Sequence, residues 1–353
     1  MGDKTGISWT DATWNPVRGC SRVSAGCQHC YAERVANRFS GPGKPYEGLV
    51  SKFGRWNGVV RMVPKHFADP ISWKRPRRIF VNSMSDLFHE SLSNEQIAAV
   101  FGVMAAAPQH TFQILTKRAK RMREWFEWLA AEACGEGLEP GVLHSCWGEY
   151  IGTLDDPPPA IQRLLDDEDN VADHAICDSE WPLRSVWLGV SVENQAAADE
   201  RIPELLRTPA AIRFISAEPL LGPVDLEEVR HQLGASSFET ASVLEGNDGF
   251  GLSAPRNRLD WVIVGCESGP GARPCEVEWL RSLRDQCAAV GVAYFLKQAV
   301  ELLTTRAVYP SAQADRVTTV HVSGGDGSKR KSGGVIELPY LDGVQHANFP
   351  ESP

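Results

Sequence analysis

The sequence has no long apolar stretch, and this excludes a membrane-spanning protein from the start. No apolar run approaches the ~20 residues that a transmembrane helix requires. The first residues, Met-Gly-Asp-Lys-Thr-Gly-Ile-Ser-Trp, contain no apolar core of a signal peptide. Gly2 follows Met1 without the remaining features of a lipidation signal. We therefore expect a cytoplasmic protein with no membrane partner.

Other familiar patterns are also missing. The sequence contains no internal repeats, and its glycine-rich run at 265–273 lacks the Gly-Lys-Ser/Thr ending of a P-loop. Its nine cysteines, an odd number, fit a disulfide framework poorly. Because cytoplasmic thiols stay reduced, clustered cysteines indicate metal binding or catalysis instead.

An excess of positive charge is missing as well. The net charge is −9, which ordinarily argues against a nucleic-acid partner. The acidity is concentrated in one stretch, however. Residues 132–182 contain thirteen acidic side chains and one arginine, so this stretch carries −12 and the remainder of the chain +3.

What is present is an alternation of short apolar runs with helical patterns. The predicted strands cover residues 78–82, 111–116, 186–191, 212–216, 261–265 and 292–297, with a further one near 13–17. The predicted helices cover 94–107, 118–132, 195–206 and 276–289. Repeated strand–helix units predict a parallel sheet.

Polar residues follow nearly every predicted strand: Asn82, Ser83 and Asp86; Thr116, Lys117 and Arg118; Ser191, Glu193 and Asn194; Ser216 and Glu218; Glu267 and Ser268; Lys297 and Gln298. The strand ends of a (β/α) barrel build its active site, whereas an open doubly wound sheet has a site only at its switch point. The pattern favours an α/β fold with a partial TIM-like barrel of about six to seven parallel strands.

The barrel is predicted to occupy residues 1–302, with two insertions. The acidic insertion at 133–182 is interpreted as a small helical lid or a partly disordered segment. The segment 230–257, rich in Gly, Ser and Asn, is interpreted as a long loop, and residues 303–353 as a C-terminal tail.

The strongest chemical signal is a group of three cysteines, Cys20, Cys27 and Cys30, spaced C-x6-C-x2-C. A [4Fe–4S] cluster normally takes four cysteines, so three would leave one iron open to a substrate or cofactor. The alternative is zinc, which takes four ligands in structural sites. The nearby candidate, His29, adjoins Cys30, and no second knuckle is evident. Whether Cys134, Cys146 and Cys177 bind a second metal is left open by their spacing.

Three cysteines after a first strand resemble the radical S-adenosylmethionine superfamily, although the first interval is longer than that superfamily's usual C-x3-C-x2-C. The chain as a whole more closely resembles the phage Gp37/Gp68-like family of the DUF5131 type. The stretches that carry this resemblance are Thr13-Trp-Asn-Pro-Val-Arg-Gly-Cys20, Cys27-Gln-His-Cys-Tyr-Ala-Glu33, Val81-Asn-Ser-Met-Ser-Asp-Leu-Phe-His89, Ile114-Leu-Thr-Lys-Arg118, Gly189-Val-Ser-Val-Glu-Asn194, Phe214-Ile-Ser-Ala-Glu-Pro-Leu-Leu-Gly-Pro223 and Val264-Gly-Cys-Glu-Ser-Gly-Pro-Gly-Ala-Arg-Pro274. One departure is Cys266, where a second glycine is expected.

The resemblance implies a [4Fe–4S] cluster whose open iron binds S-adenosylmethionine, and an electron donor whose electron cleaves it to a 5′-deoxyadenosyl radical. His29 stands where the superfamily has a residue that contacts adenine. The other implied cofactor-binding residues, which meet the methionyl amine, the ribose or the substrate, are Ser83, Asp86, Glu193, Asn194, Ser216 and Glu218. Each of these side chains has an alternative role as a helix cap or in an internal ion pair.

Basic clusters at 74–78 and 117–123 favour a nucleic-acid substrate, for repair or modification, because Lys117 and Arg118 at a strand end would neutralise phosphates. Eleven tryptophans offer stacking surfaces. The alternative for the basic cluster is a solvated helix face. Further substrate candidates at strand ends are Glu267, Ser268, Arg273 and Lys297, where the glycine-rich run would cradle an anion or form a simple turn.

Two other functions stay open. One is a zinc-stabilised nucleic-acid-binding protein without catalysis. The other is a metal-independent hydrolase that uses Asp86, Glu193 and Glu218. The sequence does not define the substrate or the oligomeric state.

Overall fold

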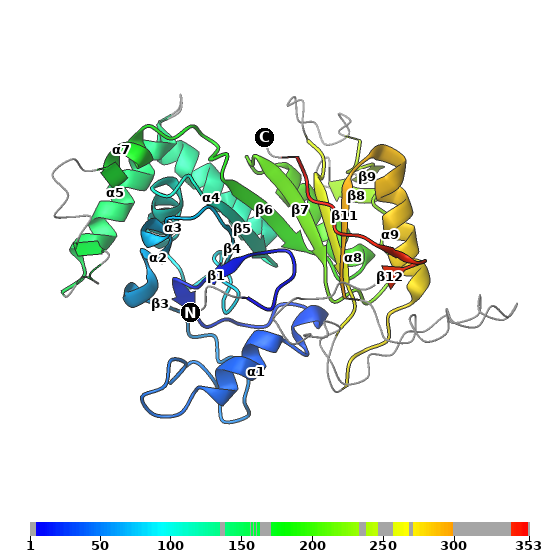
Figure 1. The fold of residues 1–353 in the computed structure, drawn as a ribbon, viewed down its shortest axis with the longest axis horizontal. Coiled ribbons are helices and arrows are strands. Elements are labelled where there is room, and N and C mark those ends of the chain that lie inside the picture. Colours follow the sequence, from blue (N-terminus) through cyan, green and yellow to red (C-terminus); the bar gives the residue numbers. More distant parts are fainter. Residues whose placement is uncertain are drawn as a thin grey trace, which may run out of the picture. The chain divides into compact units, whose positions relative to one another are not determined.

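Seven parallel strands form the central sheet, and they follow one another in the sheet as they do along the chain (Figure 1). They are β1 (Ala12–Trp14), β4 (Arg78–Val81), β5 (Thr111–Thr116), β6 (Val186–Ser191), β7 (Ile212–Ala217), β10 (Trp261–Gly265) and β11 (Ala293–Gln298). This sequential order is that of a (β/α) barrel, whereas a doubly wound sheet reverses its order at the switch point. The predicted α/β class and partial TIM-like barrel are confirmed.

The structure is a computed structural model that describes residues 5–134, 138–155, 157, 159, 161–162, 171–232, 238–245, 257–267, 271–298 and 340–351. The chain divides into two compact units, one of residues 1–188 with 208–211 and one of residues 189–207 with 212–353. Each unit is described by itself. No helix among the described residues is both long and apolar enough to cross a membrane.

The four predicted helices are present within two residues of their expected ends. They are α3 (Asn94–Ala105), α4 (Ala119–Glu132), α8 (Gln195–Leu206) and α9 (Val277–Val290). Local signals define several of these ends. Ser93 and Gln96 form a capping box at α3, and Gly291 ends α9 in the left-handed conformation, with φ 72°.

The acidic insertion of the first unit is helical where the structure describes it, in α5 (Glu139–Gly152) and α7 (Val171–Cys177). Helix α5 packs closely on α3. A Cβ placed on Gly102 of α3 would lie 2.9 Å from the Cβ of Trp147 in α5, so only glycine allows this approach. The helical interpretation therefore holds for these residues.

A small lobe leaves the sheet of the first unit after β1. The pair of short antiparallel strands β2 (Val17–Arg18) and β3 (Arg61–Met62) closes its base. Between them lie the 3-10 turn η1 (Ala25–Cys27) and helix α1 (Tyr31–Arg38). We call residues 18–61 the cysteine lobe. After β3 the chain passes through η2 (Pro64–His66) and α2 (Asp69–Ser72) to β4.

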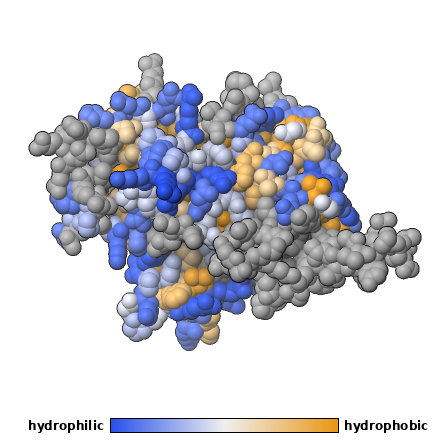
Figure 2. Space-filling model, in the orientation of Figure 1, coloured by the Kyte–Doolittle hydropathy of each residue, from blue (hydrophilic) through white to orange (hydrophobic). Residues whose placement is uncertain are grey.

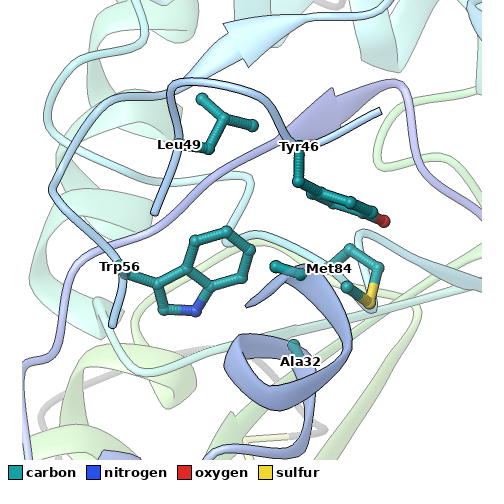
Figure 3. Packing of buried hydrophobic residues seen from close by; sticks show 6 residues of the cluster. Ala32, Tyr46, Leu49, Trp56 and Met84 are labelled. Carbon is teal, nitrogen blue, oxygen red and sulfur yellow. The ribbon is translucent and has the colours of Figure 1, made fainter. Parts of the chain in front are cut away.

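The cysteine lobe has a core of its own. Figure 3 shows Ala32, Tyr46, Leu49 and Trp56 of the lobe gathered with Met84 from the segment after β4. All five are at most 9% exposed, and Cys20 and Cys30 pack against them. The core therefore fixes the lobe and its cysteines to the end of β4.

In the second unit, part of the expected long loop at 230–257 is a β-hairpin. Strands β8 (Val229–Gln232) and β9 (Phe238–Ala241) pair antiparallel. Val229 and His231 are buried, so one face of β8 has the alternating burial typical of a strand. Polar turn residues masked this short strand in the sequence.

The end of the expected tail also packs into the second unit. Strands β12 (Tyr340–Leu341) and β13 (Val344–Gln345) form a hairpin, and the indole of Trp261 in β10 donates to the carbonyl of Asn348 at 2.8 Å. Asp342 in the hairpin turn pairs with Arg281 and Arg284 of α9. Residues 303–339 of the expected tail lie outside the described residues.

Candidate functional site

The cysteine loop begins at a glycine that no other residue can replace. Gly19 has φ +96°, a conformation that favours glycine. A Cβ at this position would lie 2.1 Å from the carbonyl oxygen of Val59, which passes over the loop. Gly19 also bridges to Ser85, beyond the end of β4. Close backbone packing on both sides therefore determines where the loop leaves β2.

The three cysteines of the loop are all free and partly exposed. Cys27 ends the η1 turn, and Cys30 directly precedes α1, where the backbone N–H groups of Ala32 and Glu33 donate to its sulfur. Burial raises the pKa of Cys30, and these two hydrogen bonds oppose the rise. Burial, followed by the charge of Asp86, raises the pKa of Cys20 to about 12. Metal binding at Cys20 must therefore displace a proton.

The grouping of side chains in the described residues limits how a metal could be held. Among the described residues, no group of three or more His, Cys, Asp or Glu side chains is close enough together to hold one metal ion. A structural zinc site needs four such ligands around a single ion. Thiolates that bind different irons of a cluster do not converge on one atom. The charges of Cys30 and Cys27 both raise the pKa of Cys20, so the three thiols of the loop lie within electrostatic range of one another.

The three cysteines of the acidic insertion differ in their surroundings. Cys134 and Cys177 are exposed, and Cys146 is buried in α5. In the described part of the chain, they belong to no potential metal-binding group of the kind just defined.

Arg118 clamps the cysteine loop to the ends of β4 and β5. Its guanidinium is 4% exposed and donates from Nη1 to Asp86 Oδ2 at 3.0 Å and from Nε to Glu90 at 2.9 Å. Its Nη2 donates to the Ser21 hydroxyl at 2.8 Å, and its Nη1 contacts the Cys20 sulfur at 4.0 Å. Burial alone would lower the pKa of Arg118, but these acidic neighbours raise it, so the group stays charged.

The substrate role predicted for Lys117 and Arg118 stays a prediction. In this structure the donors of Arg118 are used by acceptors of the protein itself. Lys117, beside it, is half-buried, and its backbone N–H donates to Asp86 at 3.2 Å. The reason is burial: a charged group that leaves water needs an internal partner. Arg118 is thus a positioning residue for the cysteine loop.

Asp86 is likewise engaged by the protein. Besides Arg118, its carboxylate accepts hydrogen bonds from the Thr116 hydroxyl at 2.7 Å and from the backbone N–H groups of Phe88 and Lys117. A carboxylate with four internal donors has little capacity left for the methionyl amine that the resemblance assigns to it. The internal ion pair, the alternative role, describes Asp86 in this structure.

His89 joins the hydrogen-bond network that Arg118, Asp86 and Ser21 form beside the cysteine loop. Its Nε2 lies 2.9 Å from the Ser21 hydroxyl, and its Nδ1 accepts the backbone N–H of Ser91 at 3.1 Å. The ring is 3% exposed. Burial, reinforced by the charge of Arg118, lowers the pKa of His89, so the ring is held neutral near pH 7. Ser21, at the start of the loop, is therefore contacted by both His89 and Arg118.

Asn82, at the end of β4, carries a signature of a functional residue. Its φ of 60° is uncommon for a residue other than glycine. It is 4% exposed, and neither atom of its side-chain amide has a hydrogen-bond partner in the described structure. Leaving such a group unsatisfied costs about 1–3 kcal/mol, and such groups cluster at binding sites. The next residue, Ser83, donates to Asn15 at 3.2 Å.

His29 lies between Cys27 and Cys30 on the loop and is half-buried. It is thus near the cysteines, as their spacing requires. Glu33, the next acidic residue, is buried and accepts from the Arg22 guanidinium and from the backbone N–H of Trp56 at 2.8 Å. This buried carboxylate ties helix α1 to both flanking loops.

In the second unit, two predicted cofactor residues have structural partners. Glu193 is 1% exposed and pairs with Arg201 of α8 at 2.9 Å. Asn194 is the N-cap of α8, accepting the backbone N–H of Ala197 at 3.1 Å. The ion pair and the helix cap, both weighed as alternatives, are what the structure contains.

The ends of β7 and β11 bring three other predicted residues together. Lys297 Nζ lies 3.1 Å from Glu218 Oε1, and the Ser216 hydroxyl donates to Glu218 Oε2 at 3.0 Å. A Cβ on Gly265, the last residue of β10, would lie 2.5 Å from Glu218 Oε1, so glycine leaves room for this carboxylate. The side chains of Glu218 and Lys297 are 13% and 22% exposed. This group remains partly accessible.

Glu267 and Arg273, two predicted substrate residues, form an ion pair with each other. Arg273 donates from Nη2 and Nε to the Glu267 carboxylate, at 2.6 and 3.0 Å. Residues 268–270 of the glycine-rich run, which is predicted to cradle an anion, lie outside the described residues. Cys266, which stands where the family resemblance leads us to expect glycine, is buried and hydrogen-bonds to Cys275. This hydrogen bond together with burial raises the pKa of Cys266.

The sequential parallel sheet, with polar groups at its strand ends, defines an α/β protein of the partial TIM-barrel class. Residues 4–350 match the family described as "Protein of unknown function (DUF5131)", and the chain belongs to this family. No curated protein and no solved structure gives a significant match to the chain. The family's description names no activity, so the site itself must support the function.

Sequence reasoning missed the roles of Ser21, Glu33 and His89. Glu33 and His89 end two of the stretches that carry the family resemblance, but each of the three residues acts through a partner that its local sequence does not indicate. Asn82 was noted only as a polar strand end. Its unsatisfied amide is a property of the fold, and no local pattern indicates it.

Proposed function

We propose that the chain is a radical S-adenosylmethionine-type enzyme in which Cys20, Cys27 and Cys30 hold a [4Fe–4S] cluster. The observation that carries the proposal is a loop of three free thiols that the fold builds at one strand end. Gly19 permits the loop, and the lobe core packs against it. When bound, the cluster and S-adenosylmethionine would supply radical chemistry, with an electron donor as the required partner.

The residues around the loop have distinct parts in this proposal. Arg118 would hold the loop through Ser21 and place a positive charge beside the Cys20 thiolate, which lowers the cost of burying that charge. Asn82 would offer its unsatisfied amide to the cofactor or substrate, and His29 would stay the candidate for adenine. Asp86 would act through Arg118 rather than on the cofactor.

Two alternatives receive less support from the geometry. A zinc-stabilised binding protein requires four convergent ligands, and the described residues contain no such group. A hydrolase needs free carboxylates, but Asp86, Glu193 and Glu218 each pair with a basic side chain.

Metal analysis of cysteine variants tests the proposal. After anaerobic reconstitution, the protein should contain about four irons and four sulfides per chain. Cys20→Ala, Cys27→Ala and Cys30→Ala should each lose most of this iron. The matched controls, Cys134→Ala and Cys177→Ala, remove exposed free thiols elsewhere and should keep it. Equal iron in all five variants, or stoichiometric zinc in the unmodified protein, would contradict the proposal.

A further inference from the structure

The cysteine lobe has a charge opposite to that of the chain. Its residues, 18–61, include eight Lys or Arg and two Glu, a net charge of +6, while the whole chain carries −9. Of the two acidic residues, Glu33 is buried and paired with Arg22. Five basic side chains of the lobe are exposed and form no ion pair with another described residue: Arg34, Arg38, Lys44, Lys52 and Arg55.

The same lobe presents the exposed aromatic rings. Among the described residues, three Phe, Tyr or Trp side chains are largely exposed, and all three belong to the lobe: Tyr31, Phe39 and Phe53. Figure 2 shows apolar side chains among hydrophilic ones on the surface around α1 and the segment after it, at the bottom of the view. Isolated exposed apolar residues are ordinary, but rings confined to one basic lobe are not.

The most exposed ring sits on a rigid turn. Phe53 is 77% exposed. Its turn is closed by a hydrogen bond of 2.7 Å from the Ser51 backbone N–H to the Arg55 carbonyl, and Gly54 supplies the φ of +74° that the turn requires. The Lys52 ammonium lies 5.1 Å from the centre of the Phe53 ring. The turn therefore displays a ring beside the Lys52 cation, and Arg55, which closes the turn, is also exposed.

The base of this turn is anchored in the lobe core. Trp56, directly after the turn, is buried, and its backbone N–H donates to the buried Glu33 carboxylate at 2.8 Å. Val50 bridges to Trp56 across the turn. The ring of Phe53 is thus exposed on a structured support, and this lowers the entropy lost when a partner binds.

We propose that the cysteine lobe binds single-stranded nucleic acid, with Phe53 and Phe39 stacking on bases and Lys52 and Arg55 contacting phosphates. Exposed rings interleaved with cations suit a polyanion whose bases are unstacked. A duplex keeps its bases stacked and offers nothing to the rings. Taken with the proposed function, the strand would be the substrate of the enzyme, but its binding does not depend on the cluster.

A membrane surface fits the lobe less well. Peripheral binding needs an amphipathic helix with a continuous apolar face. The buried residues of α1 are Ala32, Glu33 and Ala36, and its exposed positions include Arg34 and Arg38. Ala32, Val35 and Ala36 of α1 therefore face the lobe core, and its exposed side combines the single ring of Tyr31 with Arg34 and Arg38.

Fluorescence anisotropy with the full-length protein tests the proposal. The probes are labelled single strands of DNA and RNA of about 20 nucleotides, a matching duplex, and anionic phosphatidylglycerol vesicles. We expect single strands to bind more tightly than the duplex. Phe53→Ala should weaken this binding roughly tenfold, the effect of losing one stacked base, without changing its salt dependence. Lys52→Gln with Arg55→Gln should also reduce the slope of log affinity against log salt by about 1.4.

The control variants remove comparable exposed groups elsewhere in the first unit. Leu138→Ala removes an exposed apolar side chain, 59% exposed, and Arg184→Gln an exposed charge, and both should bind as the unmodified protein does. Absence of binding at low salt, binding to vesicles alone, equal affinity for the duplex, or equal losses in the controls would overturn the proposal. The binding assay can use metal-free protein, so the two proposals fail separately. If the iron analysis fails and single strands still bind, only the proposed function is contradicted. If iron is bound and single strands do not bind, only this inference is contradicted.

Discussion

Replacement of Arg118 by methionine is the sharpest test of the clamp on the cysteine loop. Methionine keeps much of the side-chain volume but removes the charge that faces Asp86. Removing one partner of a buried ion pair costs about 3–5 kcal/mol, because the other charge is left uncompensated. Asp86 would keep three hydrogen-bond donors, and the pair with Glu90 adds little because that side chain is 61% exposed. We therefore expect the free energy of unfolding to fall by about 3 kcal/mol, at the lower end of this range.

Urea unfolding followed by tryptophan fluorescence measures this loss. Lys120→Met is the matched control, since Lys120 begins the same helix but is 76% exposed, and it should change stability by less than about 0.5 kcal/mol. Adding Asp86→Asn to Arg118→Met should cost less than the sum of the two single changes, because the two groups interact directly. A loss below about 1 kcal/mol for Arg118→Met, or strict additivity in the double variant, would refute the reasoning.

Four further outcomes are expected. Asn82→Gly, which suits a φ of 60°, should leave the free energy of unfolding within about 1 kcal/mol yet abolish spectral changes on adding S-adenosylmethionine; unaltered spectra would contradict the role given to this amide. The lowered pKa of His89 means that the contribution of the neutral ring to stability is complete above the unfolded pKa of ~6.5 and is lost as pH falls below that value. His89→Gln should therefore flatten the decline of stability between pH 7 and pH 5. An unchanged slope would contradict this role of His89. Hydrogen bonds from Arg281 and Arg284 lower the pKa of Asp342 to about 2, so its contribution to stability is present above pH ~4 and falls as the pH approaches 2. Because this side chain is 38% exposed, Asp342→Asn should cost at most about 1 kcal/mol at pH 7 and clearly less near pH 2. An equal loss at both pH values would refute the pairing. Gly102→Ala should lower the melting temperature although alanine favours helices, because its Cβ would meet Trp147 at 2.9 Å; a higher melting temperature would contradict the packing of α5 on α3.

The sheet was predictable because its strands are short apolar runs that are bounded by polar residues. Runs such as 186–191 and 261–265 are buried along their whole length, as strands of a parallel sheet are. The hairpin at β8 and β9 was not predicted because each strand has only four residues and they lie among polar residues. The docking of residues 340–351 depends on contacts with Trp261 and α9. These partners are distant in the sequence, so the sequence of the segment itself does not predict the contacts.

The sequence predicted which residue types lie at the candidate site. It predicted much less well what each of these side chains contacts. The cysteine loop and the polar strand ends are where the sequence places them. The sequence could not show that Arg118, Glu193 and Asp86 would be buried with internal partners, because burial is set by the whole fold. The charge of the cysteine lobe was countable from the sequence, but the exposure of Phe53 depends on the turn that carries it.

Electron paramagnetic resonance of the reduced, reconstituted protein tests the central claim most directly. If Cys20, Cys27 and Cys30 hold a cluster with one open iron, the reduced protein gives a cluster signal, and adding S-adenosylmethionine shifts it. The same experiment with Cys20→Ala should give no such signal. A cluster signal that S-adenosylmethionine leaves unchanged, or no signal together with stoichiometric zinc, would contradict the account.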